Sequence, residues 1–221
     1  MRWIDGISRW DHVTRLNRWS GFTALFLALL TLTITLTINA FWLYRLDIHW
    51  LGITHLVNMS PTRIMHNYYQ LLRYLELPWV TELNMTNFPT SFTGMIHFED
   101  VKRLFLINHI VLVLSIIPAG WFLRQLHQRG EEWRLIRPAQ VAAVIPVFLG
   151  VMLTINFNGF FIAFHQVLFR NNDWLFDPDL DPIINALPDT FFLHCFILAF
   201  VLFELGVGWL YWRGRHAIHQ A

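Results

Sequence analysis

Two of the 11 histidines lie where a polar segment meets a long apolar run. His97 precedes one such run by a few residues, and His165 follows another. Imidazole takes or gives a proton near neutral pH, so two converging rings could act as general base and general acid. Asp100 follows His97 by three residues, which places both on one face of a helix. We expect this carboxylate to orient the ring of His97 and raise its basicity.

A second polar stretch, residues 170–182, is dense in Asp, Asn and Pro. These residues form tight turns by hydrogen-bonding their own backbone. This predicts an ordered loop that Asp173 and Asp177 shape. Alternating Asp and Asn oxygens also suit a cation such as calcium, but the spacing does not match an EF-hand loop. A metal site is therefore the alternative interpretation of this stretch.

Composition indicates where these residues sit. The chain is 55% apolar and 14% charged, whereas soluble domains are about 25% charged. A membrane helix needs roughly 20 mostly apolar residues. Four runs qualify, at about residues 20–44, 104–123, 139–159 and 190–212. We predict an all-α integral membrane protein, a single polytopic domain over residues 1–221, with four transmembrane helices and extracytoplasmic helical and loop segments at the outer interface.

Basic residues predict the orientation of the spans. Arginines gather before the first span, between the second and third, and after the fourth, and such segments are usually cytoplasmic. Both termini are then cytoplasmic. Residues 45–103 and 158–189 lie outside, and the second of these segments is rich in Asp. Residues 1–19 alternate Arg with apolar residues, which predicts a short helix in the inner interface.

Local signals place further elements. Ser60-Pro61 is a helix start, and Leu77-Pro78 ends that helix. The third apolar run is too long for one span, and Asn156, Asn158 and Gly159 suggest a break. Residues after the break, including His165, would then lie at the outer interface.

The short loop between the second and third spans predicts that these spans are antiparallel neighbours. On that basis His97 and His165 should converge at one depth. The alternative is that both are simply interfacial polar residues at span ends.

Two segments resemble a known family, the bacterial lipoprotein intramolecular transacylases called Lit. One is His97-Phe98-Glu99-Asp100-Val101-Lys102. The other begins at Phe164-His165, continues through Asn171-Asn172-Asp173-Trp174-Leu175-Phe176-Asp177-Pro178, and ends with Asp181-Pro182-Ile183-Ile184-Asn185 and Leu187-Pro188. The resemblance covers most of the chain loosely and about 30 residues closely.

The resemblance implies a specific reaction in a bacterial plasma membrane. The substrates are lipoproteins whose N-terminal Cys carries a diacylglyceryl group and a free α-amino group. The enzymes move the sn-2 acyl chain onto that amine and leave a lyso-form lipoprotein. The two catalytic histidines of the family correspond to His97 and His165, on the extracytoplasmic side. The matching segments also contain Asn171 and Trp174 as supporting residues, and Lys102 as a further candidate donor.

The expected partners are therefore diacylglyceryl-modified lipoproteins and membrane lipid. No metal and no cofactor is expected. A net charge of +1 argues against nucleic acid as a partner. Two alternatives remain open at this stage: a non-catalytic membrane subunit or sensor, and a metal-dependent membrane hydrolase that would use His97, His165 and the Asp-rich loop.

Overall fold

The computed structural model describes residues 4–220, and the side chains of residues 18–218. Within these residues the regular secondary structure is entirely helical. The elements are α1 (Ile4–Ile38), α2 (Phe41–Trp50), α3 (Ile53–Leu56), α4 (Pro61–Glu76), α5 (Phe92–Gln128), the 3₁₀ helix η1 (Glu132–Leu135), α6 (Ile136–Ile155), α7 (Phe157–Leu168), α8 (Ile183–Ala186) and α9 (Asp189–Gln220).

Four of the described helical segments are long and apolar enough to cross a membrane, which confirms the predicted fold class. They are Arg18–Ile38, Phe92–Gln128, Glu132–Ile155 and Asp189–Ile218. The first ends six residues before the predicted limit at residue 44. There the amide of Asn39 donates to the carbonyl of Thr35 and to Glu76 on α4, and the chain then starts α2.

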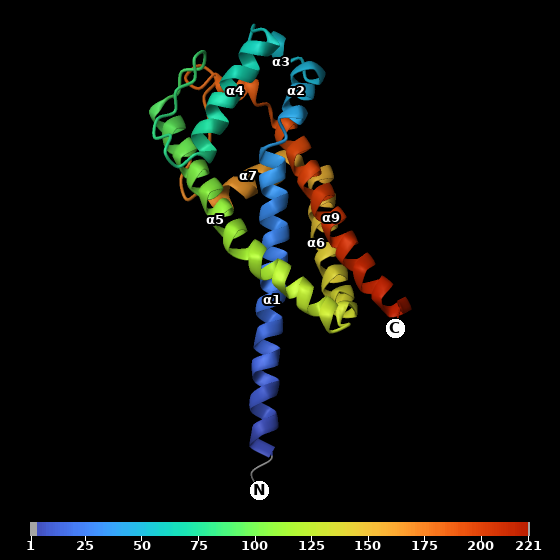
Figure 1. Cartoon of the computed structure of the whole chain (residues 1–221). Coiled ribbons are helices and arrows are strands. Elements are labelled where there is room, and N and C mark those ends of the chain that lie inside the picture. Colours follow the sequence, from blue (N-terminus) through green and yellow to red (C-terminus); the bar gives the residue numbers. More distant parts are fainter. Residues whose placement is uncertain (1–3, 221) are drawn as a thin grey trace.

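The N-terminal segment is helical, as predicted, but it is not a separate interfacial helix. Residues 4–19 continue into the first span as one helix of 35 residues. No proline interrupts this stretch, so the helix has no reason to end before the span. Figure 1 shows it extending as a straight rod beyond the other helices. Residues 1–3 lie outside the described chain.

The long helices pack as two pairs. α1 packs along α5, α6 packs along α9, and α1 also contacts α9. α2, α3, α4 and α8 form a cap at one end of the bundle, and both termini lie at the other end (Figure 1). The cap has its own apolar core, in which the ring of Tyr44 stacks on Tyr68 at 4.0 Å and its hydroxyl donates to the carbonyl of Ala186.

The structure corrects the prediction that the second and third spans are packed neighbours. η1 and a short turn do connect them, but α5 leans toward α1 and the cap whereas α6 follows α9 (Figure 1). The connection fixes only the ends of the two helices. Side-chain packing decides their course, and here it separates them.

α7 crosses the gap that this divergence leaves. The predicted break is confirmed at Asn156, whose backbone leaves the helical conformation with φ −156° and ψ 88°. Its side-chain oxygen accepts from the backbone N–H of Gly159 and so caps α7. After the break α7 runs across the bundle toward α5 (Figure 1), which carries His165 to the helix that holds His97.

Candidate active site

His97 lies in the second turn of α5, with only 8% of its surface exposed. α5 begins after Ser91, which caps the helix because its hydroxyl accepts from the backbone N–H of Gly94. Aromatic rings surround the imidazole. The closest centroids are those of Phe169 at 4.9 Å and Phe176 at 5.4 Å. Its Nδ1 is buried and has no hydrogen-bond partner in the protein.

His165 lies in the last turn of α7 and is half-buried. Its Nδ1 lies 2.8 Å from the backbone carbonyl oxygen of Phe161. A carbonyl only accepts, so Nδ1 carries the hydrogen and a neutral ring keeps its lone pair on Nε2. The local fold therefore presents Nε2 as a base.

The two imidazoles meet, as the sequence predicts, but by a different route. Their ring centroids are 5.9 Å apart, and no hydrogen bond joins these two described side chains. Phe169 contacts both rings and fixes their separation. The rings are brought together by the crossing of α7, since α5 and α6 do not pack side by side.

Solvation affects the protonation of this pair. Burial lowers the pKa of His165 below its ordinary value of 6.5, although the hydrogen bond to Phe161 and the negative charge of Asp189 act in the opposite direction. The ring is therefore neutral at neutral pH, with Nε2 able to accept a proton.

Asp100 does not orient His97 as predicted. One of its carboxylate oxygens accepts from Asn171 at 3.0 Å, and the other pairs with Arg103 at 3.2 Å. The carboxylate is thus held by residues other than the imidazole one turn before it. Its effect on the site passes through Asn171.

Asn171 and Trp174 link Asp100 to His165. The indole N–H of Trp174 donates to the backbone carbonyl of Asn171 at 3.1 Å, and the indole ring packs on His165 at a centroid distance of 4.9 Å. Together, Asp100, Asn171 and Trp174 form a chain of contacts from α5 to the ring of His165, here called the brace. It holds the two histidine-bearing helices in register.

The Asp-rich loop is built from turns, as predicted. The side chain of Asn171 accepts from the N–H of Asp173 at 3.3 Å, and that of Asp177 accepts from the N–H of Asp179 at 3.0 Å. Asp173 and Asp177 therefore shape the loop. Within the described residues, no group of three or more His, Cys, Asp or Glu side chains is arranged to hold a metal ion.

Lys102 lies on another face of α5. Its ammonium donates to the carbonyl of Val80 and lies over the ring of Tyr74, 4.2 Å from the centroid. Lys102 follows His97 by five residues, so the two side chains point in directions about 140° apart around the helix axis. These contacts join α5 to α4 and its following loop, so the structure does not bring Lys102 to the histidine pair.

Asp181 is a site residue that our sequence reasoning did not single out. It is 2% exposed, and its two oxygens accept from the backbone N–H of Ser91 at 2.7 Å and from the hydroxyl of Ser91 at 2.6 Å. This negative charge at the start of α5 also suits the helix dipole. Gly94 allows the approach, because a Cβ there would lie 2.3 Å from Asp181. An Asp followed by Pro after a turn-rich stretch was the available signal.

Comparison with known proteins gives one family. The model of the family "Lipoprotein intramolecular transacylase Lit" matches residues 20–192. The structure is also similar to that of the membrane-integral lipoprotein intramolecular transacylase Lit from Bacillus cereus, with a TM-score of 0.90 and 28% identity over 95% of this chain and 98% of that one. No curated protein sequence matches.

Two variant structures of the Bacillus cereus protein match as well. In one a single histidine is changed to arginine, and in the other to alanine. Both have a TM-score of 0.82 and 28% identity. The first match covers 98% of this chain and 96% of that one, and the second covers 97% and 98%.

Proposed function

This chain belongs to the lipoprotein intramolecular transacylase (Lit) family, and we propose that it moves the sn-2 acyl chain of a diacylglyceryl lipoprotein onto the α-amino group of the lipoprotein's N-terminal Cys. The chain is thus an acyltransferase integral to a membrane, and the interpretation as a non-catalytic subunit is wrong. The observation that carries the detailed proposal is the meeting of His97 and His165 within a cluster of aromatic side chains.

The reaction balances without a nucleophile from the protein. The amine nitrogen forms a bond to the acyl carbon, the ester C–O bond breaks, and a proton passes from nitrogen to the leaving sn-2 oxygen. Amine and ester belong to one molecule, so holding them in a reactive geometry contributes roughly 7–11 kcal/mol. The products are an amide and a secondary alcohol.

We assign the base to His165. Its Nδ1 is held by the carbonyl of Phe161, which leaves the Nε2 lone pair to take a proton from the attacking amine. The lowered pKa of His165 keeps this nitrogen unprotonated at neutral pH. An ammonium group cannot attack a carbonyl, so proton removal is the first task of the site.

His97 has the complementary role. Its buried ring lies among aromatic side chains, where a hydrogen bond is worth more than in water. A neutral imidazole N–H there stabilises the oxyanion that forms on the ester carbonyl. His165, protonated by the amine, then gives that proton to the leaving sn-2 oxygen. Asp100, Asn171 and Trp174 act as positioning residues, because the brace sets the place of His165 relative to α5.

The test is the mass of a lipoprotein's N-terminal lipopeptide. The chain is expressed in a bacterium whose lipoproteins carry a diacylglyceryl group and a free amine, beside His97→Ala, His165→Ala and the exposed control His66→Ala at equal membrane levels. We expect an N-acylated, monoacylglyceryl peptide from wild type and control, and the unmodified diacyl peptide from the two site variants. Unmodified peptide from the wild type would refute the proposed reaction.

We further propose that the cap and the histidine pair face outward from a bacterial plasma membrane and that both termini are cytoplasmic. The arginine-rich turn between α5 and α6 supports this orientation. Cys introduced at His66 on α4 should react with a membrane-impermeant thiol reagent in intact cells. Cys introduced at Arg129 should react only after lysis. The reverse pattern of labelling would show that the orientation is opposite to the proposed one.

A further inference from the structure

The proposed reaction starts from a cation. The α-amino group of a peptide has a pKa of about 8, so the substrate reaches the site mostly as an ammonium at neutral pH. His97 and His165 carry no negative charge, and the nearby carboxylate of Asp100 is paired with Arg103. The ammonium therefore needs another anionic group close to the base.

Asp189, the first residue of α9, is a carboxylate that lies beside the base. The rings of Phe161 on α7 and Phe192 on α9 pack at a centroid distance of 5.4 Å, which joins the two helices here. His165 follows Phe161 by four residues and so lies one turn further along the same face of α7. Asp189 precedes Phe192 by three residues and likewise lies one turn further back along α9. The negative charge of Asp189 accordingly acts on the ring of His165.

The carboxylate of Asp189 is exposed and unpaired. Its side chain makes no hydrogen bond and no ion pair with the residues that the structure describes. Two other carboxylates near the histidine-bearing segments, those of Asp100 and Asp181, already accept hydrogen bonds within the protein. Asp189 is thus an anion without a partner, placed next to the residue that receives the proton of the amine.

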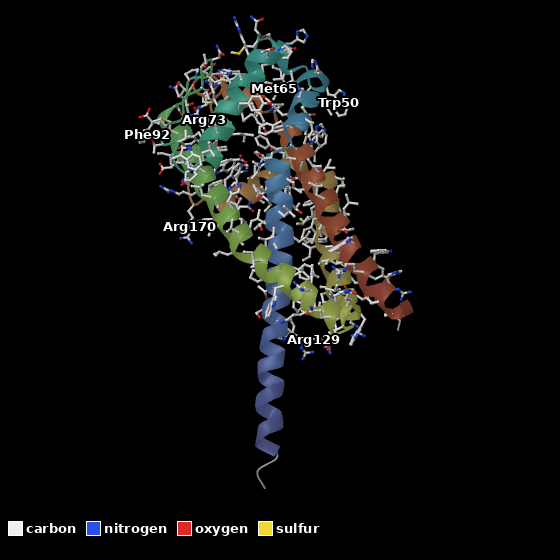
Figure 2. All side chains as sticks on the ribbon, in the orientation of Figure 1. Trp50, Met65, Arg73, Phe92, Arg129 and Arg170 are labelled. Atoms are coloured by element: carbon white, nitrogen blue, oxygen red, sulfur yellow. The ribbon has the colours of Figure 1, made fainter. Side chains whose placement is uncertain are left out.

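The other surroundings of His165 do not compensate this charge. His97 meets the ring from α5, and the segment after α7 presents aromatic rings to it. Arg170, five residues further along the chain, is exposed and lies at the edge of the molecule (Figure 2). Among the described residues, Asp189 is the one whose charge raises the pKa of His165.

On the basis of the transacylase reaction proposed above, we propose that Asp189 binds the α-ammonium group of the lipoprotein substrate. The cation lies between the carboxylate and Nε2 of His165, which then takes one of its protons. The positive charge passes from the amine to the imidazole and stays close to the same carboxylate throughout. Because the attraction is present before and after proton transfer, it tightens substrate binding and changes the rate of the bound complex little.

Binding is measured with a dialkyl ether analogue of the diacylglyceryl lipopeptide, which has no ester to transfer. The analogue is made with a free amine and with an acetylated amine. Both are titrated against the full chain in detergent at about pH 6.5, where a free α-amino group is charged. The proteins are wild type, Asp189→Asn, and Glu82→Gln as the matched control at an exposed carboxylate in the loop after α4. Asparagine has nearly the shape of aspartate, so Asp189→Asn removes mainly the charge.

We expect wild type and control to bind the free-amine analogue about tenfold more tightly than the acetylated one, because acetylation removes a charge-assisted hydrogen bond. Asp189→Asn should bind the two analogues equally. The preference of wild type should fade above about pH 8, as the free amine loses its charge. Equal binding of the two analogues by wild type, or an unchanged preference in Asp189→Asn, would overturn the inference.

Kinetics with the diester lipopeptide separate substrate binding from a structural role of Asp189. Asp189→Asn should raise KM about tenfold with little change in kcat. The acidic midpoint of kcat/KM should move to lower pH, because the variant lacks a charge that raises the pKa of His165. A lower kcat with an unmoved midpoint would assign Asp189 to the packing of α9. Absence of N-acylation by wild type would refute the proposed reaction itself, whereas the ether analogues test the role of Asp189 without it.

Discussion

The chain places two histidines, His97 and His194, in different surroundings. His97 faces another imidazole and aromatic rings, and its buried Nδ1 has no partner in the protein. His194 faces the fully buried carboxylate of Asp47 on α2. The first ring keeps a nitrogen free for a substrate, whereas the second gives its Nδ1 to an acceptor on another helix. The first arrangement suits proton transfer with a substrate, and the second suits a fixed link between two helices.

The largest effect is expected when the two imidazoles of the candidate active site are removed. His97→Ala and His165→Ala should each lower the rate of N-acylation by about 10²–10⁴-fold, the usual range for general acid–base catalysis. Rates are measured from the time course of lipopeptide mass at equal enzyme levels. A loss of less than tenfold in both variants would show that positioning alone carries the reaction.

Removing the carboxylate that faces His194 should act on stability. Asp47→Ala leaves Nδ1 of His194 without its acceptor, and losing a hydrogen bond to a charged group costs about 2 kcal/mol. The free energy of unfolding in detergent should fall by about that amount, with Asp47→Asn falling less because it retains an acceptor. Equal losses in the two variants would assign the effect to packing.

The pH profile separates a neutral base from a charged imidazole. Because the pKa of His165 lies below 6.5, its Nε2 is free at neutral pH and becomes protonated only on acidification. The acylation rate should be level near neutral pH and then fall about tenfold per pH unit, with a midpoint below 6.5. A midpoint above that value would mean that the base is held in its charged form.

The smallest expected effect concerns the brace. Asn171→Ala removes the side-chain hydrogen bond to Asp100 and keeps the backbone carbonyl that accepts from Trp174. The loop that carries Trp174 then loses its link to α5, so kcat should fall by several-fold to about tenfold. KM should change less, because no proposed substrate contact is lost. A rise in KM with kcat unchanged would instead indicate that Asn171 binds the lipoprotein.

Local sequence signals predicted local structure well. Ser60-Pro61 starts α4, Leu77 follows its end, and Asn156 breaks the third apolar run, since each acts on its own backbone. The Asp-rich loop forms Asx turns for the same reason. The end of the first span was missed because Asn39 turns the chain through a contact with Glu76, which is distant in sequence.

Contacts between distant segments were not predictable from spacing. Asp100 is on the expected helix and near His97. Its carboxylate, however, accepts a hydrogen bond from Asn171, which lies in a loop 71 residues further along the chain. Lys102 is likewise held by Val80 and Tyr74. Asp47 and His194 are separated by 147 residues, and neither carries a local pattern. The meeting of His97 and His165 was expected, but its cause, the crossing of α7, follows from helix packing.

The break at Asn156 also makes the position of His165 depend on the thickness of the bilayer. α6 has 20 residues and so spans about 30 Å, which equals a typical hydrocarbon core. α7 then turns away from the direction of α6 and crosses the bundle toward α5. In a thicker bilayer the short α6 would draw α7 and His165 below the headgroups, away from an ester at the surface. Hydrophobic mismatch would therefore slow this enzyme even if every contact around the two histidines stayed intact.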